Sequence, residues 1–141
     1  MIIATRQLGT VEVQEDSIVV FKHGVPGFET LTRFVLIDLG EELPLRLLQS
    51  TERPEVSFFI GNPFQFYPDY EWEMPDELKA ELAITASTDV EVWSIVTLAS
   101  DLSQSTINLL APIVLNRVQR KGKQYIIHAS SFGHAHPIFQ R

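Results

Sequence analysis

Short runs of β-branched and aromatic residues, separated by turn-forming residues, recur along this chain and limit it to a fold built from strands. Alternation of apolar and polar residues is clearest at Val11-Glu12-Val13-Gln14. Further runs cover residues 18–21, 34–37, 45–48, 56–60 and 90–98. Their spacing of roughly 10 to 15 residues favours a mainly antiparallel, all-β domain, either a small barrel or a sandwich.

A hairpin is predicted near the end of the chain. The runs Thr106–Val118 and Lys123–His128 flank Gln119-Arg120-Lys121-Gly122, where we expect Gly122 to adopt the left-handed conformation that closes the turn. Pro112 has no amide proton for a strand ladder, so it predicts an edge or a bulge within the first run.

Helical signals are few. Pro75–Leu82 begins with proline, carries Asp76 and Glu77 in its first turn and spaces Leu78 and Leu82 one turn apart. A second, shorter helical turn is expected at Phe28–Thr32. The chain should therefore contain one or two short helical turns among its strands.

Length and composition fit one globular domain over residues 1–141. There are no cysteines, and 45% of the residues are hydrophobic. The first residues lack the basic flank and apolar stretch of a signal peptide, so we expect a soluble, cytoplasmic protein with no membrane partner.

Charge is unevenly distributed along the chain. The net charge is −7, with all 18 acidic residues and 6 basic ones before position 102, and 5 basic residues after it. Acidity of this kind disfavours nucleic acid as a direct partner and favours a basic protein.

One loop has the signature of a type II turn. In Gly24-Val25-Pro26-Gly27-Phe28-Glu29, proline presets the second turn position and Gly27 allows the positive φ needed at the third. The turn is either a rigid corner with Phe28 in the core or a platform that presents Glu29 to a partner.

Aromatic and acidic residues interleave between Gly61 and Pro75, in a stretch stiffened by prolines. Such residues anchor protein interfaces, although the same alternation also places one aromatic face in a core. We expect different members to do each. With Glu29, the candidate partner-binding residues are Asn62, Phe64, Asp69, Tyr70, Glu71 and Glu73.

Two other classes of function remain open. Asp69, Glu71 and Glu73 on one face of a strand would suit a small carboxylate-dependent hydrolase, and the basic turn around Arg120 would suit an RNA-binding module. The recognised phosphate-binding, nucleophile and zinc-protease motifs do not occur, and His134 and His136 lack a third ligand nearby. We therefore expect no catalytic residues, no metal and no cofactor.

Four blocks together resemble the FliW family of flagellar assembly factors. They are Gly24–Glu29, Asn62-Pro63-Phe64 with Tyr67–Glu71, Asn108–Asn116, and Gly122-Lys123-Gln124. The resemblance covers about Ile2 to His136. It implies a cytoplasmic, barrel-like, non-enzymatic regulator that binds the translational repressor CsrA, relieves repression of flagellin synthesis, and binds flagellin in a partner switch.

Overall fold

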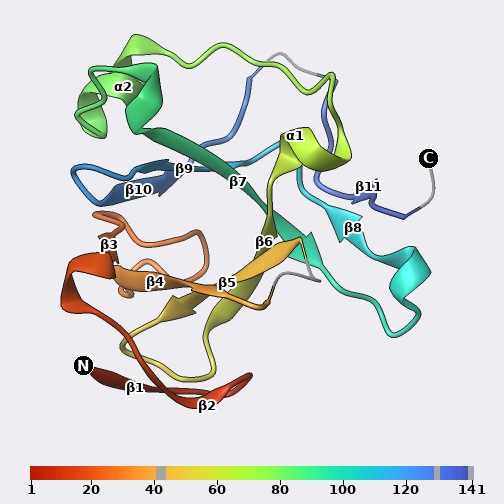
Figure 1. The fold of residues 1–141 in the computed structure, drawn as a ribbon. Helices are drawn as coiled ribbons and strands as arrows, with labels where there is room; N and C mark the ends of the chain where they lie inside the picture. The colour runs from red at the N-terminus through yellow and green to blue at the C-terminus, as the bar shows by residue number, and fades with distance from the viewer. Residues whose placement is uncertain (41–43, 129–130, 140–141) are drawn as a thin grey trace.

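Seven strands of the described chain close into a barrel, as Figure 1 shows. The computed structural model describes residues 1–40, 44–128 and 131–139. The strands are β1 (Ile2–Thr5), β2 (Gly9–Glu12), β3 (Val19–Val20), β4 (Arg33–Asp38), β5 (Leu45–Ser50), β6 (Ser57–Gly61), β7 (Val90–Thr97), β8 (Thr106–Ile107), β9 (Ile113–Asn116), β10 (Lys121–Gln124) and β11 (His136–Pro137). The helices are α1 (Pro63–Phe66) and α2 (Asp76–Glu81), with 3₁₀ turns at Glu15–Ser17, Ser87–Asp89 and Leu102–Gln104.

Neighbouring strands of the barrel run antiparallel, with one exception. The order around the ring is β7, β6, β5, β4, β3, β10 and β9, and β9 pairs again with β7. β3 and β10 are parallel and share the single pair Val20 and Lys121. Closure thus brings together segments about a hundred residues apart in the sequence.

The barrel interior is filled by large apolar side chains. Phe21, Phe34, Leu48, Ile60 and Ile113 are fully buried and belong to one cluster. The rings of Phe21 and Phe34 meet edge to face, with their centroids 5.3 Å apart. Such pairs add to the stability that burial alone provides.

Strand β9 is buried on both faces. Ile113 and Leu115 point into the barrel, while Val114 packs outside against Leu78 of α2 and Leu82, which follows it. The Asn116 amide donates to the carbonyl oxygens of Leu82 and Ala83, at 2.8 and 3.1 Å. α2 is therefore fixed on the barrel wall by apolar contact and by a buried amide.

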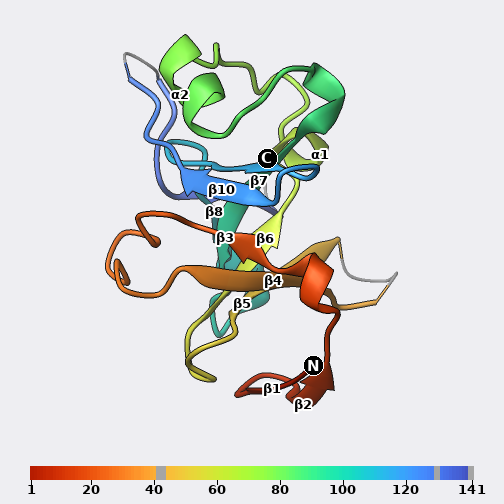
Figure 2. The same ribbon diagram turned by 90° about the vertical axis from the view of Figure 1, so that its left-hand side faces the viewer.

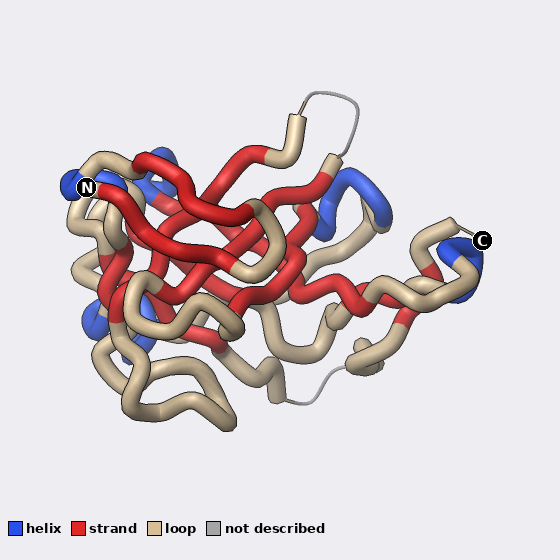
Figure 3. The backbone as a smooth tube through the Cα atoms, turned by 90° about the horizontal axis from the view of Figure 1, so that it is seen from below, coloured by secondary structure: helices blue, strands red, loops and turns tan. Residues whose placement is uncertain are grey.

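Two additions lie outside the ring. The β1–β2 hairpin crosses the barrel strands, as seen in Figure 3, and buries Ile3 against Ile18 and Val35. At the other side, β8 pairs with β7 and β11 pairs with β8, so the C-terminal part of the chain extends the sheet beyond the barrel.

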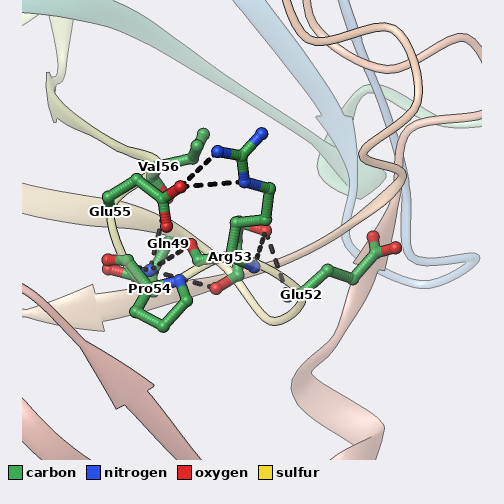
Figure 4. Close-up of polar contacts among 7 residues, drawn as sticks. Gln49, Glu52, Arg53, Pro54, Glu55 and Val56 are labelled. Carbon is green, nitrogen blue, oxygen red and sulfur yellow. Dashed lines mark hydrogen bonds and ion pairs between the residues drawn. The ribbon is translucent and has the colours of Figure 1, made fainter.

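The turn from β5 to β6 is held by a buried glutamine, shown in Figure 4. The Gln49 side-chain amide donates to the carbonyl oxygens of Ser50, Pro54 and Val56, at 3.0 to 3.2 Å. Arg53 and Glu55 form an ion pair on the outside of the same turn. These hydrogen bonds fix the path of the turn.

Most sequence-predicted elements are confirmed. Strands occur in each apolar run noted above, and α2 fills most of Pro75–Leu82. The type II turn is present, because the Phe28 amide donates to the Val25 carbonyl at 2.7 Å and Gly27 has φ +91°.

Three predictions were wrong in detail. Phe28–Thr32 forms turns and no helix. The run Thr106–Val118 is two strands, because the Asn108 carboxamide accepts the amide protons of Leu110 and Ala111 and turns the chain before Pro112. Pro112 lies just before β9, in the stretch 108–112 that bulges out opposite residues 94–95 of β7, so the interruption predicted at Pro112 is present although it divides the run into two strands.

The third error concerns Gly122. Arg120, with φ +59°, takes the left-handed conformation in the hairpin turn, and Gly122 lies within β10 opposite Leu115. A Cβ atom on Gly122 would lie 2.6 Å from Leu115 Cδ2 and 2.7 Å from Phe21 Cζ. This glycine is required for close packing at the point where β10 joins the barrel.

Gly122→Ala is expected to lower the free energy of unfolding by about 1–3 kcal/mol, because the added methyl overpacks the core. Thermal and urea unfolding would measure the loss. Gly133→Ala is the matched control, since its nearest neighbour is 3.6 Å away. Equal melting temperatures for the two variants would contradict the assigned role of Gly122.

Candidate interaction site

The segment between β6 and α2 begins with α1, a helix of one turn. Asn62 caps it, because its side-chain oxygen accepts the Phe64 amide proton at 2.9 Å. Pro63 occupies the first turn, where the missing amide proton has no cost. The sequence Asn-Pro-Phe thus supplies both the cap and the first residue of a helix.

Tyr70 anchors the middle of the segment. It is 4% exposed, its hydroxyl donates to the Leu109 carbonyl at 2.8 Å, and its ring packs against Phe132 and Phe64. Burial raises the pKa of the Tyr70 phenol far above its ordinary value. Tyr70 was expected at the partner surface, but it is a core residue because it packs in one buried cluster with Leu109 and Phe132.

Beyond Tyr70, side chains alternate between the protein and solvent, although the segment forms no strand. Trp72 is half-buried and stacks on Tyr125, with ring centroids 5.6 Å apart and planes 20° from parallel. Met74 packs with the cluster beneath α2. Glu71 and Glu73 are exposed on the outer side.

These side chains line a groove of about 530 Å³ beside α2. Its walls include Glu71, Trp72, Glu73 and Asp76 on one side, and Tyr125 and His128 on the other. A second groove of about 480 Å³ continues past Asp76 and His128 to Glu81, which forms an ion pair with Lys123 at 2.8 Å. We call these two hollows together the acidic groove.

The geometry of the acidic groove suits recognition of a cationic or amphipathic segment. Its lining combines aromatic and apolar side chains with exposed carboxylates. Prolines at positions 63, 68 and 75 stiffen the segment, and the stacked pair fixes its path. Preorganised residues lose less conformational entropy when a partner binds.

Comparison with known proteins identifies the family. The sequence model described as FliW protein matches residues 2–138. The flagellar assembly factor FliW of Bacillus licheniformis is 41% identical over 138 residues, which is 98% of this chain and 96% of that one. The protein of the same name from Geobacillus kaustophilus is 40% identical over 139 residues, covering 99% and 96%.

The chain belongs to the FliW family. A crystal structure of the flagellar assembly factor FliW superimposes on it with a TM-score of 0.94 and 38% sequence identity, covering 100% of this chain and 99% of that one. The likeness confirms the resemblance seen in the sequence and the all-β fold.

The structure places the remaining predicted residues of this FliW protein at separate positions. Phe64 is 42% exposed on α1, and Asp69 is exposed in the turn before Tyr70. Asn62 borders another hollow, of about 290 Å³, with Arg46 and Trp93. Only Glu71 and Glu73 of the predicted set line the acidic groove.

Glu29 lies on the type II turn, away from the acidic groove. Its carboxylate accepts the Gly27 amide proton at 2.8 Å, and this hydrogen bond holds the pKa of Glu29 below its ordinary value. The side chain is exposed, and its hydrogen bond stabilises its own turn.

Sequence reasoning missed the second wall of the acidic groove. Tyr125, Ile127 and His128 reach it from the chain after β10. Aromatic and apolar residues in that run were visible, but no local signal indicates that they lie beside Trp72, more than fifty residues earlier.

The described residues contain neither a metal-binding cluster nor a membrane-spanning helix. No three or more His, Asp or Glu side chains among the described residues are grouped so as to hold a metal ion. His136 instead accepts the Gly133 amide proton at 2.7 Å. No helix in the described ranges is long and apolar enough to cross a membrane.

Tyr70→Phe is expected to reduce the free energy of unfolding by about 1–2 kcal/mol at neutral pH, because the Leu109 carbonyl loses its buried donor. Because the pKa of Tyr70 is raised in the folded protein, the stabilisation also depends on pH. The folded protein keeps a phenol proton that the unfolded chain loses near 10.0, so this stabilisation is complete below pH 10.0 and declines above it.

Urea unfolding at neutral pH and at roughly pH 11 would test both statements. The variant should lose less stability between the two pH values than the parent does. Parallel decline in the two proteins would show that Tyr70 titrates normally.

Proposed function

We propose that this protein is a non-enzymatic flagellar assembly factor that acts in the cytoplasm by binding a CsrA-type translational repressor and flagellin in turn. Membership of the FliW family supports the role in flagellar assembly. The resemblance noted in the sequence supplies the two partners. In this scheme the free protein sequesters the repressor, and accumulating flagellin displaces it.

The observation that carries the proposal is the acidic groove. An RNA-binding repressor presents basic residues, and the groove offers Glu71, Glu73 and Asp76 around the stacked Trp72 and Tyr125. Aromatic residues provide contact area, and carboxylates on the rim increase the rate of encounter with a basic partner. We propose the groove as the repressor-binding surface.

Docking accounts for these carboxylates better than hydrolysis does. Asp69, Glu71 and Glu73 are exposed, and among the described residues none of the three takes part in a hydrogen bond or ion pair. Proton transfer in a hydrolase needs a carboxyl group whose pKa is tuned by burial or by a close partner. Their exposed positions favour a role in attracting a charged protein.

Glu71→Lys is expected to weaken binding of CsrA about tenfold, because it replaces attraction by repulsion at a preorganised site. The thermal stability should change by less than about 0.5 kcal/mol, since the residue is exposed. Calorimetric titration at low and high salt would measure the affinity, and melting curves would check the fold.

Glu12→Lys provides the matched control, because Glu12 is exposed on the distant β2 strand. It makes the same charge change without touching the groove. If both variants weaken binding equally, overall charge rather than the groove attracts the repressor, and this part of the proposal fails.

The partner switch makes a separate prediction. Flagellin added to a preformed complex with CsrA should release the repressor in proportion to the flagellin bound. Size-exclusion chromatography with both partners labelled would follow the exchange. A stable ternary complex would contradict the switch while leaving the groove intact as a binding surface.

A further inference from the structure

A cationic surface lies on the side of the barrel where the ring closes. Lys121 of β10, Val20 of β3 and Arg33 of β4 are in register across three neighbouring strands, and all three are exposed. Figure 2 shows β10, β3 and β4 one below another, with α2 above them. Strands are spaced about 4.8 Å apart, so the two cationic residues lie about 10 Å apart on either side of the valine.

Lys22 and Arg120 enlarge this surface. Lys22 follows the buried Phe21 and is exposed like Val20. Arg120 keeps one guanidinium nitrogen 3.2 Å from the Ile18 carbonyl oxygen, which holds the side chain beside β3. We call Lys22, Arg33, Arg120 and Lys121, with Val20 among them, the cationic surface.

The cations of this surface lack acidic partners. Within the described chain, no ion pair joins any of the four to a carboxylate, although the protein has 18 acidic residues against 11 basic ones. Two acids beside this surface already have other partners. Glu52 accepts the amide protons of Thr32 and Arg33, and Glu81 pairs with Lys123.

A hollow beside the cationic surface provides apolar contact. It measures about 450 Å³ and is lined by Val20, Leu82 and Gly122 together with Lys22, Arg120 and Lys121. Gln119 and the carboxylate of Glu81, which is paired with Lys123, complete the lining. Val20 is 41% exposed, and no segment of the described chain covers it. The surface thus combines an apolar centre with a border in which four cations outnumber the one paired acid, Glu81.

We propose that the cationic surface binds an acidic protein segment that carries an apolar residue between its carboxylates. Charge complementarity favours carboxylates that lie on either side of Val20, and the apolar residue between them would cover Val20. Single-stranded RNA is disfavoured, because the surface has no aromatic side chain on which bases stack. This surface is distinct from the acidic groove, so the proposal does not depend on the repressor.

The test uses the full chain and a fluorescein-labelled peptide of glutamates with two central leucines as the probe. Fluorescence anisotropy at low salt should detect binding to the parent. The double variant Lys22→Glu with Lys121→Glu should bind about tenfold more weakly, because two attractive pairs become repulsive. In NMR spectra of the nitrogen-15-labelled parent protein, the backbone amide signals of Val20 and Lys121 should shift when the peptide is added.

The matched control is Arg6→Glu with Lys79→Glu, which has the same net charge and alters exposed residues elsewhere. Its affinity for the peptide should stay within about twofold of the parent's. Equal weakening in the control and the test variant would overturn the proposal, since overall charge would then explain the binding. Lys22→Gln with Lys121→Gln replaces the test variant if charge reversal impairs folding.

Two further arms distinguish other occupants. Tighter binding of a uridine oligonucleotide of matched charge would assign the surface to nucleic acid and overturn the proposal. Sedimentation velocity that shows parent dimers, lost in the test variant, would assign it to a second copy and overturn it as well. Val20→Ser should weaken binding of the leucine-containing peptide and leave binding of a peptide with glycines in place of the leucines unchanged. Equal effects on the two affinities would contradict the apolar contact.

Discussion

Strand β9 pairs with β7 along one side and with β10 along the other, and this double pairing turns an open sheet into a barrel. Both of its edges and both of its faces are therefore occupied. Its one polar side chain, Asn116, is 1% exposed, donates to two carbonyl oxygens after α2 and accepts the amide protons of Val118 and Gln119. A buried polar group with this many partners imposes one arrangement on the helix, the strand and the hairpin turn.

Closure of the ring also positions the two charged surfaces. β10 continues into Tyr125, which meets Trp72 and completes the acidic groove, while its first residue, Lys121, begins the cationic surface. Glu81 lines hollows on both sides of α2. Opposite charges on a small protein are thus separated by one short helix whose place is set by the barrel wall.

Local pattern was enough to predict the strands, α2 and the type II turn, because alternation, capping and glycine placement act over a few residues. It failed where distant segments decide the outcome. Gly122 looked like a turn residue, yet its place is set by Phe21, about a hundred positions earlier. Between Gly61 and Pro75, alternation placed one aromatic face in a core, whereas the cap from Asn62 begins α1 and leaves Phe64 exposed.

The candidate site shows the same contrast between residues placed by local pattern and residues placed by distant contacts. Exposure of Glu71 and Glu73 follows from their alternation with Trp72 and Met74, whereas burial of Tyr70 depends on Leu109 and Phe132, which the linear pattern does not associate with it. The partner wall at Tyr125 and His128 is equally non-local. Residue type indicated the chemistry of the site, and topology determined which residues share it.

The N-terminal hairpin has an energetic independence that follows from its small contact with the barrel. Its apolar residues form a cluster of their own with Ile18, Val35 and Ile37, and the amide of Arg6 bonds the Pro54 carbonyl in the turn held by Gln49. Segments with few buried contacts open without global unfolding. We therefore expect the strands at the start of the chain to exchange their amide protons sooner than the strands of the closed ring.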